Sequence, residues 1–212
     1  GVGKGDRVVS ENNPFACGTC RLCTLGYPNL CPEKRAMGIL SDGCFADYVK
    51  LPAHLLHCIP ENVTFEEAAL SEPLAVATHA VSGRAGIAQG DTVVVFGPGA
   101  IGLLAAQVAR AEGAGKVLLV GTARDAMRLD CAKHLGLETL CAGAEDLADA
   151  VMDRTDGTGA DVVVTASGLA LLFVDGDPVA ARAMRSATTV ASVPTLEKRT
   201  RSAAGMISSS FR

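Results

Sequence analysis

A cluster of four cysteines is the strongest chemical signal in the sequence. Its members follow the spacing C-x2-C-x2-C-x7-C and are Cys17, Cys20, Cys23 and Cys31. Four thiolates suit a closed, tetrahedral zinc site, provided that the longer gap loops back. An iron–sulfur cluster is an alternative, because Pro32 follows the last cysteine as in ferredoxins, but ferredoxins have a last gap of three residues. The spacing therefore favours zinc over that cluster. The expected compartment and the crowding of the cysteines disfavour disulfides, and loops seldom concentrate four thiols without a metal.

The other candidate ligands are expected to be structural. The four remaining cysteines fall in predicted strands or helices and are Cys44, Cys58, Cys131 and Cys141. A free cysteine in such an element most often acts as a small core residue. His54 and His57 flank a pair of leucines, and we interpret them as packing or surface residues rather than as metal ligands.

A glycine-rich turn is the second candidate site. Gly97, Gly99 and Gly102 form G-x-G-x-x-G after the apolar run "DTVVVF" and before an alanine- and leucine-rich helical stretch. The first glycine permits a tight turn, the second lets the backbone approach a pyrophosphate, and the third allows close helix–strand packing. Ile101 lies in the same turn, where free N–H groups favour a phosphate. A ligand-free turn is the alternative, but the strand–turn–helix context favours dinucleotide binding.

The end of the next strand bears on the choice between NAD and NADP. An NAD site usually has an acidic residue there, ~20 residues after the turn, for the ribose 2′-hydroxyl. Gly121 and Thr122 occupy that place, and the nearest acid, Asp125, comes later, at the expected start of a helix. Arg124 could meet a 2′-phosphate. The sequence therefore favours NADP over NAD. The alternative is that Arg124 is a surface residue on a loop and contacts no nucleotide.

The elements that carry these sites change along the chain. Residues 6–60 predict short strands and loops, including a strand in "CFADYVKL" at 44–51, because apolar runs alternate with Gly, Pro and Asn. Thr64 and Glu67 predict a capping box at a helix start. Pro73 interrupts that helix and suits the first turn of a second helix, which runs to about Gly83.

Residues 90–168 alternate between apolar runs and helical patterns. The predicted strands are "DTVVVF", "KVLLVG" and "ADVVVTASG", with helices between them. This alternation predicts an α/β fold with a parallel sheet that is covered on both faces. After Gly168 no period of 2 or 3.6 residues continues, so residues 169–212 are interpreted as a diverged or out-of-frame tail.

Composition argues against several classes of partner. The net charge is −4 and no basic stripe is present before the tail, where "KRTR" at 198–201 is interpreted as a solvated charge run, so the composition argues against nucleic acid. No apolar run approaches the ~18 residues of a membrane span. Eight cysteines without a secretory leader favour a reducing, cytoplasmic location. The opening "GVGKGDRVV" suggests that the chain begins inside a domain.

The order of the motifs resembles zinc-dependent medium-chain alcohol dehydrogenases, most closely the polyol branch of sorbitol (L-iditol) and threonine dehydrogenases. The resemblance covers about residues 1–168 and rests on the cysteine loop, "DG-x-FA-x-Y", "EPLAVA-x-HA" and "GPGAIG". It implies a Rossmann-type parallel sheet preceded by part of a GroES-like β-rich catalytic domain. The implied boundaries are 1–76 for the GroES-like part, 77–168 for the Rossmann domain and 169–212 for an uncertain tail.

The resemblance also implies roles for the sites. The four clustered cysteines would hold a structural zinc. Glu72 would sit at the catalytic zinc, directly or through a water, whereas its alternative role is to complement the helix dipole. The main catalytic ligands, a cysteine and a His-Glu pair, are expected upstream of this chain.

The implied activity is NAD(P)-linked oxidation of a secondary alcohol or polyol to a ketone in a homo-oligomer, a dimer or tetramer. This fragment alone is expected to be inactive. The alternative is a non-catalytic dinucleotide-binding module or redox sensor that keeps the structural zinc.

Overall fold

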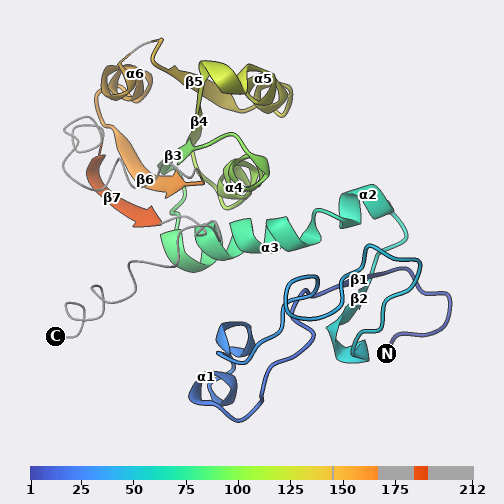
Figure 1. The fold of residues 1–212 in the computed structure, drawn as a ribbon. Coiled ribbons are helices and arrows are strands. Elements are labelled where there is room, and N and C mark those ends of the chain that lie inside the picture. The colour runs from blue at the N-terminus through green and yellow to red at the C-terminus, as the bar shows by residue number, and fades with distance from the viewer. Residues whose placement is uncertain (145, 167–183, 191–212) are drawn as a thin grey trace. The chain divides into compact units, whose positions relative to one another are not determined.

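Two units with different architectures make up the chain in this computed structural model. The first comprises Gly1–Glu72 and the second Pro73–Arg212. The structure describes residues 1–144 and 146–166 and the backbone of a strand at 184–190 (Figure 1). Most of the expected tail, 169–212, therefore lies outside the described residues.

The first unit consists mainly of loops. Strands β1 (Val8–Ser10) and β2 (Leu56–Cys58) form an antiparallel pair in which Val9 lies opposite His57. Its other regular elements are helix α1 (Arg21–Thr24), helix α2 (Phe65–Ala68) and two 3-10 helices, Pro28–Leu30 and Ala53–Leu55. Short strands and loops were the expectation for this region, and it is confirmed.

The strand predicted in residues 44–51 is wrong. These residues form bends and coil, and the side chains of Phe45 and Tyr48 are almost fully exposed. A strand is stabilised by backbone hydrogen bonds to a neighbouring strand. No described residue pairs with this segment. The alternating pattern is therefore present without the partner that would make it a strand.

The predicted capping box is confirmed at the start of α2. The Glu67 N–H donates to Thr64 Oγ1 at 3.1 Å, and the Thr64 N–H donates to Glu67 Oε2 at 2.8 Å. The bond from the Thr64 N–H is the main reason that the pKa of Glu67 lies below its ordinary value. Helix α3 (Ser71–Ala80) follows with Pro73 in its first turn, and a π-helical turn, Val81–Ala85, continues it.

The second unit is built on one parallel sheet. Its strands are β3 (Thr92–Phe96), β4 (Lys116–Thr122), β5 (Glu138–Ala142), β6 (Ala160–Thr165) and β7 (Met184–Val190). The order β5-β4-β3-β6-β7 places the first strand between β4 and β6, and every pairing is parallel. The chain thus reverses its direction of winding beside β3, where α/β sheets of this kind bind ligands at the carboxyl ends of the strands.

Helices cover both faces of this sheet. They are α4 (Ala100–Ala111), α5 (Ala126–His134) and α6 (Leu147–Arg154). Val93 and Val95 of β3 pack with residues of α4 and α5, whereas Val94 packs with residues of α6 on the opposite face. Figure 1 shows these helices around the sheet. The α/β fold expected from the sequence is therefore confirmed.

The sequence prediction omits strands β5 and β7. Strand β5 lies at one edge of the sheet, and Leu140 is its one buried residue. Such a strand has only a weak apolar pattern in the sequence. Strand β7 pairs with β6 inside the region that was expected to have no regular pattern. None of the described helices is both long and apolar enough to cross a membrane.

Candidate functional site

The four clustered cysteines converge because the loop between Cys17 and Cys31 folds back on itself. Cys20 and Cys23 are brought together by α1, and a 3-10 helix returns the chain to Cys31. Gly26 allows this return, since it adopts a left-handed φ of 85° between the two helices. The Cys17 N–H points at Cys31 Sγ, 3.4 Å away, and the Cys20 N–H at Cys17 Sγ, 3.3 Å away.

The sulfur positions fit a single tetrahedral ion. All four Sγ atoms lie within 4.8 Å of one another. The separation is 3.9 Å for Cys17–Cys23, 3.9 Å for Cys20–Cys31 and 3.6 Å for Cys17–Cys31. A zinc–sulfur bond of about 2.3 Å requires edges of about 3.8 Å between tetrahedral sulfurs. These separations are much longer than a disulfide bond of about 2.05 Å.

Local hydrogen bonds and burial separate the acidities of two of these thiols. Backbone N–H groups, first that of Thr19 and then that of Cys20, lower the pKa of Cys17 to about 6. Burial raises the pKa of Cys23 to about 12. The thiolate is the form that binds a metal, so a cation in the cluster would favour deprotonation of both groups.

The expectation that the other cysteines are core residues is wrong for three of them. Cys44, Cys58 and Cys131 are exposed, and Cys141 is half-buried. Cys44 lies in the unpaired coil segment, and Cys58 ends the second strand of a two-stranded sheet. Among the described residues, the four clustered cysteines are the single group whose spacing could hold a metal.

The two histidines are surface residues, as expected. His54 and His57 are both exposed. His57 Nε2 lies 3.2 Å from Glu11 Oε1 across the β1–β2 pair, and both of these side chains are more than half exposed. Such an exposed pair contributes little to stability.

Glu72 lies outside the cysteine cluster, in the first turn of α3. Its side chain is exposed, and Asn12 Nδ2 donates a hydrogen bond to Glu72 Oε1 at 2.9 Å. Sequence reasoning missed Asn12, because the two residues are 60 positions apart and no local pattern links them.

The glycine-rich turn joins β3 to α4 at the carboxyl end of the sheet. Gly97 has a left-handed φ of 95°, which a residue with a side chain adopts only with strain. Its N–H donates to Val120 O at 2.8 Å, so the turn is anchored on β4. The first backbone hydrogen bond of α4 is donated by the Leu103 N–H to Gly99 O. The N–H groups that precede Leu103 in the first turn, including that of Ile101, have no acceptor within the helix.

Gly99 and Gly102 have different surroundings. A Cβ atom on Gly102 would lie 1.8 Å from Gly97 O, so the helix and the turn are in contact at this residue. A Cβ atom on Gly99 would have no neighbouring heavy atom within 4 Å. The structure thus leaves open space at the second glycine of the motif and none at the third. This difference matches the roles of these glycines in dinucleotide-binding turns.

The end of β4 has no available acidic group. A Cβ atom on Gly121 would lie 2.8 Å from Pro98 Cγ and 3.0 Å from Leu129 Cδ2. The Thr122 N–H and hydroxyl both donate to Asp125 Oδ2, at 3.0 and 2.8 Å, and they lower the pKa of that carboxyl.

Two arginines are close to Asp125 in the sequence. Arg128 Nη1 lies 3.2 Å from Asp125 Oδ1, so both oxygens of Asp125 have partners. Arg124 is exposed on the same turn. Sequence reasoning named Arg124 and missed Arg128, although its spacing of three residues from Asp125 at a helix start is a local signal.

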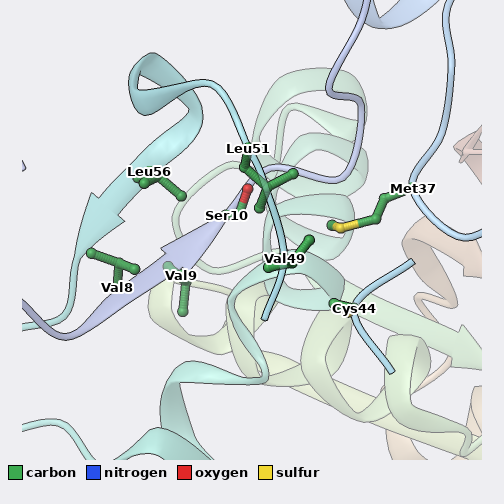
Figure 2. A pocket seen from close by; sticks show the side chains of 8 residues that line it. All are labelled: Val8, Val9, Ser10, Met37, Cys44, Val49, Leu51 and Leu56. Atoms are coloured by element: carbon green, nitrogen blue, oxygen red, sulfur yellow. The ribbon is translucent and has the colours of Figure 1, made fainter. Parts of the chain in front are cut away.

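An apolar pocket of about 410 Å³ lies in the first unit (Figure 2). Its lining residues are Val8, Val9, Ser10, Met37, Cys44, Val49, Leu51 and Leu56. Neither the clustered cysteines nor Glu72 line it. The pocket therefore carries none of the groups that the chemistry of the candidate sites requires.

Two family models match the chain. The model described as "Zinc-binding dehydrogenase" matches residues 100–198, and the model described as "Alcohol dehydrogenase GroES-like domain" matches residues 1–61. The first match extends past residue 168, where the apolar pattern of the sequence fades.

Similar curated proteins include two bacterial dehydrogenases. A sorbitol dehydrogenase from Halalkalibacterium halodurans is 45% identical over 169 residues, which cover 79% of this chain and 49% of the relative. A D-arabitol-phosphate dehydrogenase from Enterococcus avium is 41% identical over 165 residues, covering 77% of this chain and 47% of the relative. The chain thus spans about half the length of these relatives.

Solved structures of dehydrogenases have a similar fold. A zinc-binding dehydrogenase from Sinorhizobium meliloti bound to NADP has a TM-score of 0.79 at 33% identity, covering 93% of this chain and 57% of that chain. The 2R,3R-butanediol dehydrogenase from Bacillus subtilis has a TM-score of 0.71 at 28% identity, covering 90% of this chain and 53% of that chain.

Proposed function

Because this chain belongs to the zinc-binding dehydrogenase family, we propose that the whole protein oxidises a secondary alcohol or polyol to a ketone with NADP or NAD. The observation that carries the proposal is the glycine-rich turn beside β3, with open space at Gly99 and helix N–H groups next to it. The names of the relatives, which include sorbitol and D-arabitol-phosphate dehydrogenases, support a polyol substrate.

The cysteine cluster is proposed to hold a structural zinc. Its donor set and three sulfur separations of 3.6 to 3.9 Å, with all four Sγ atoms within 4.8 Å of one another, support this assignment. A [4Fe–4S] cluster binds each cysteine to a different iron, so its thiolates would have to stand further apart than thiolates that share one ion. The role proposed for this zinc is to hold together a loop-rich unit that has few buried apolar side chains of its own.

Glu72 is proposed to contribute to a second, catalytic zinc site. Its exposed carboxylate lies at a helix start, where Pro73 restricts the backbone. A bound zinc would supply Lewis-acid polarisation of the alcohol oxygen. Glu72 itself would add a negative charge to that site.

NADP is proposed as the preferred dinucleotide. Both oxygens of Asp125 have partners within the chain, which leaves the end of β4 without an acid for the ribose. The exposed Arg124 on the same turn supports contact with a 2′-phosphate. The two nucleotides differ by this phosphate alone.

We further propose a cytoplasmic homo-oligomer, a dimer or tetramer. The proposed zinc cluster supports a reducing compartment, because clustered thiols there bind a metal more often than they form disulfides. The expected partner is the small-molecule alcohol or polyol, rather than a nucleic acid or a membrane.

Metal content and cofactor reduction test the proposed function in the whole protein. Zinc and iron are measured per chain, and nicotinamide absorbance is followed with a panel of polyols and secondary alcohols. Two zincs, no iron and alcohol-dependent reduction of NADP would support the proposal. One zinc without reduction would favour a non-catalytic dinucleotide-binding module. Iron with sulfide would contradict the zinc assignment.

A further inference from the structure

The Glu72 carboxylate has one hydrogen-bond partner among the described residues. Asn12 Nδ2 donates to Oε1 at 2.9 Å, and no described residue donates to Oε2. One oxygen is therefore held by the protein while the other is available. A carboxylate with both oxygens free would rotate about its terminal bond, because this torsion has a broad energy minimum.

Asn12 is itself held on both sides of its amide. Asn13 Nδ2 donates to Asn12 Oδ1 at 2.9 Å. That contact makes Oδ1 the acceptor, and the NH₂ group of Asn12 is therefore the end that faces Glu72. The assignment of the amide follows from the network as a whole.

The backbone around Asn12 is also anchored. The Met37 N–H donates to Asn12 O at 2.9 Å, and the preceding Glu11 N–H donates to Leu55 O at 3.0 Å. Asn12 thus follows β1 in a segment that is tied to two other parts of the first unit. A donor on such a segment can orient its acceptor better than a donor on a free loop.

The chemistry of the amide suits a carboxylate that must retain its charge. An amide N–H donates without a positive charge, so it orients Glu72 and leaves the negative charge uncompensated. Lysine or arginine at this position would form an ion pair and compete with a metal cation for the carboxylate. Hydrogen bonds to the groups around a metal commonly set ligand orientation.

We propose that Asn12 is a positioning residue, which holds Glu72 Oε1 so that Oε2 is presented to the catalytic zinc. The inference rests on the proposed function, because it assumes that Glu72 acts at that zinc. Asn12 touches neither substrate nor cofactor in this proposal and acts through Glu72 alone.

A double-mutant cycle in the whole protein tests this role. Asn12→Ala should lower kcat/KM by about tenfold, the lower end of the range for partners of metal ligands. In a Glu72→Ala background the same substitution should cause no further loss, because its effect passes through the carboxylate. Asn12→Leu, which keeps the branched outline of the side chain but removes its hydrogen-bonding groups, should behave like Asn12→Ala. Asn62→Ala is the matched control, because Asn62 is exposed and its side chain makes no hydrogen bond to any described residue.

Zinc release provides a readout that does not depend on turnover. A colorimetric chelator, pyridylazoresorcinol, should remove the catalytic zinc several-fold faster from Asn12→Ala than from the parent, with the slower, cysteine-bound zinc unchanged. Asn62→Ala should change neither rate.

The outcomes separate this inference from the proposed function. If Glu72→Ala lowers activity and zinc retention but both Asn12 variants match the parent, the positioning role is wrong and the proposed function stands. An equal loss from Asn12→Ala in both backgrounds would make Asn12 merely structural and would also overturn the inference. If Glu72→Ala itself has no effect, the proposed role of Glu72 fails, and the inference fails with it.

Discussion

Gly102→Ala should destabilise the second unit, although alanine normally favours a helix. The new Cβ would lie 1.8 Å from Gly97 O, and that oxygen belongs to the backbone of the turn. An ordinary carbon–oxygen contact is about 3.3 Å, so the helix and the turn would have to separate by about 1.5 Å.

Two opposing terms set the size of the effect. Replacing glycine by alanine inside a helix stabilises it by about 1 kcal/mol. Overpacking a tight contact costs about 1–3 kcal/mol, and more where the backbone itself must move. Since the clashing atom is a backbone oxygen, we expect a net loss of about 2 kcal/mol in the free energy of unfolding.

Gly99→Ala is the matched control, because its Cβ would meet no heavy atom within 4 Å. Its φ of −74° suits alanine, so the free energy of unfolding should change by less than about 1 kcal/mol, the usual cost at a helix N-cap. The new methyl group should instead obstruct the dinucleotide phosphates. NADP affinity, measured by titration calorimetry, should therefore fall while stability is kept.

Urea unfolding followed by circular dichroism gives the stability of both variants. If Gly102→Ala is as stable as the parent, the contact between helix and turn does not explain the third glycine. If Gly99→Ala binds NADP like the parent, the open space at Gly99 is not where the phosphates lie.

Three further predictions concern the cysteines, the capping box and the dinucleotide. Cys31→Ser should lower the zinc content by one ion per chain and lower the unfolding temperature. Cys58→Ser, at an exposed cysteine, should change neither. Equal zinc content in the two variants would contradict the cluster assignment. Because the pKa of Glu67 is lowered, its contribution to stability is present above about pH 4.3 and is lost as pH falls through the lowered value. Glu67→Gln should therefore destabilise at neutral pH and have less effect in acid, and an equal effect at both would refute this. Arg124→Ala should raise KM for NADP and leave KM for NAD unchanged in steady-state assays.

The parts of the fold that could be predicted from sequence are those with local causes. The capping box joins Thr64 to Glu67 across three residues, and the glycine turn lies between a strand and a helix that are adjacent in sequence. The cysteine spacing likewise lies within one loop. In each of these cases the residues that interact are close along the chain.

The parts that could not be predicted depend on distant partners. Residues 44–51 have the apolar pattern of a strand, but no described strand pairs with them. Strand β5 has little pattern of its own and is held by its pairing with β4. The contact between Asn12 and Glu72 joins positions 60 residues apart, so neither residue type nor spacing predicts it. The assigned roles of Glu72 and Arg124 remain predictions.

The crowding around Gly121 limits how this chain could change its cofactor during evolution. An acidic side chain at that position would collide with the ring of Pro98 and with Leu129. Since Pro98 lies within the glycine-rich turn that is proposed to bind the phosphates, a single substitution at Gly121 would be expected to disturb that turn while it added a group for the ribose. A shift towards NAD would therefore need a smaller residue at position 98 or 129 first, or would have to begin at Thr122. The order of mutations, rather than the final residue alone, would decide whether such a variant survives selection.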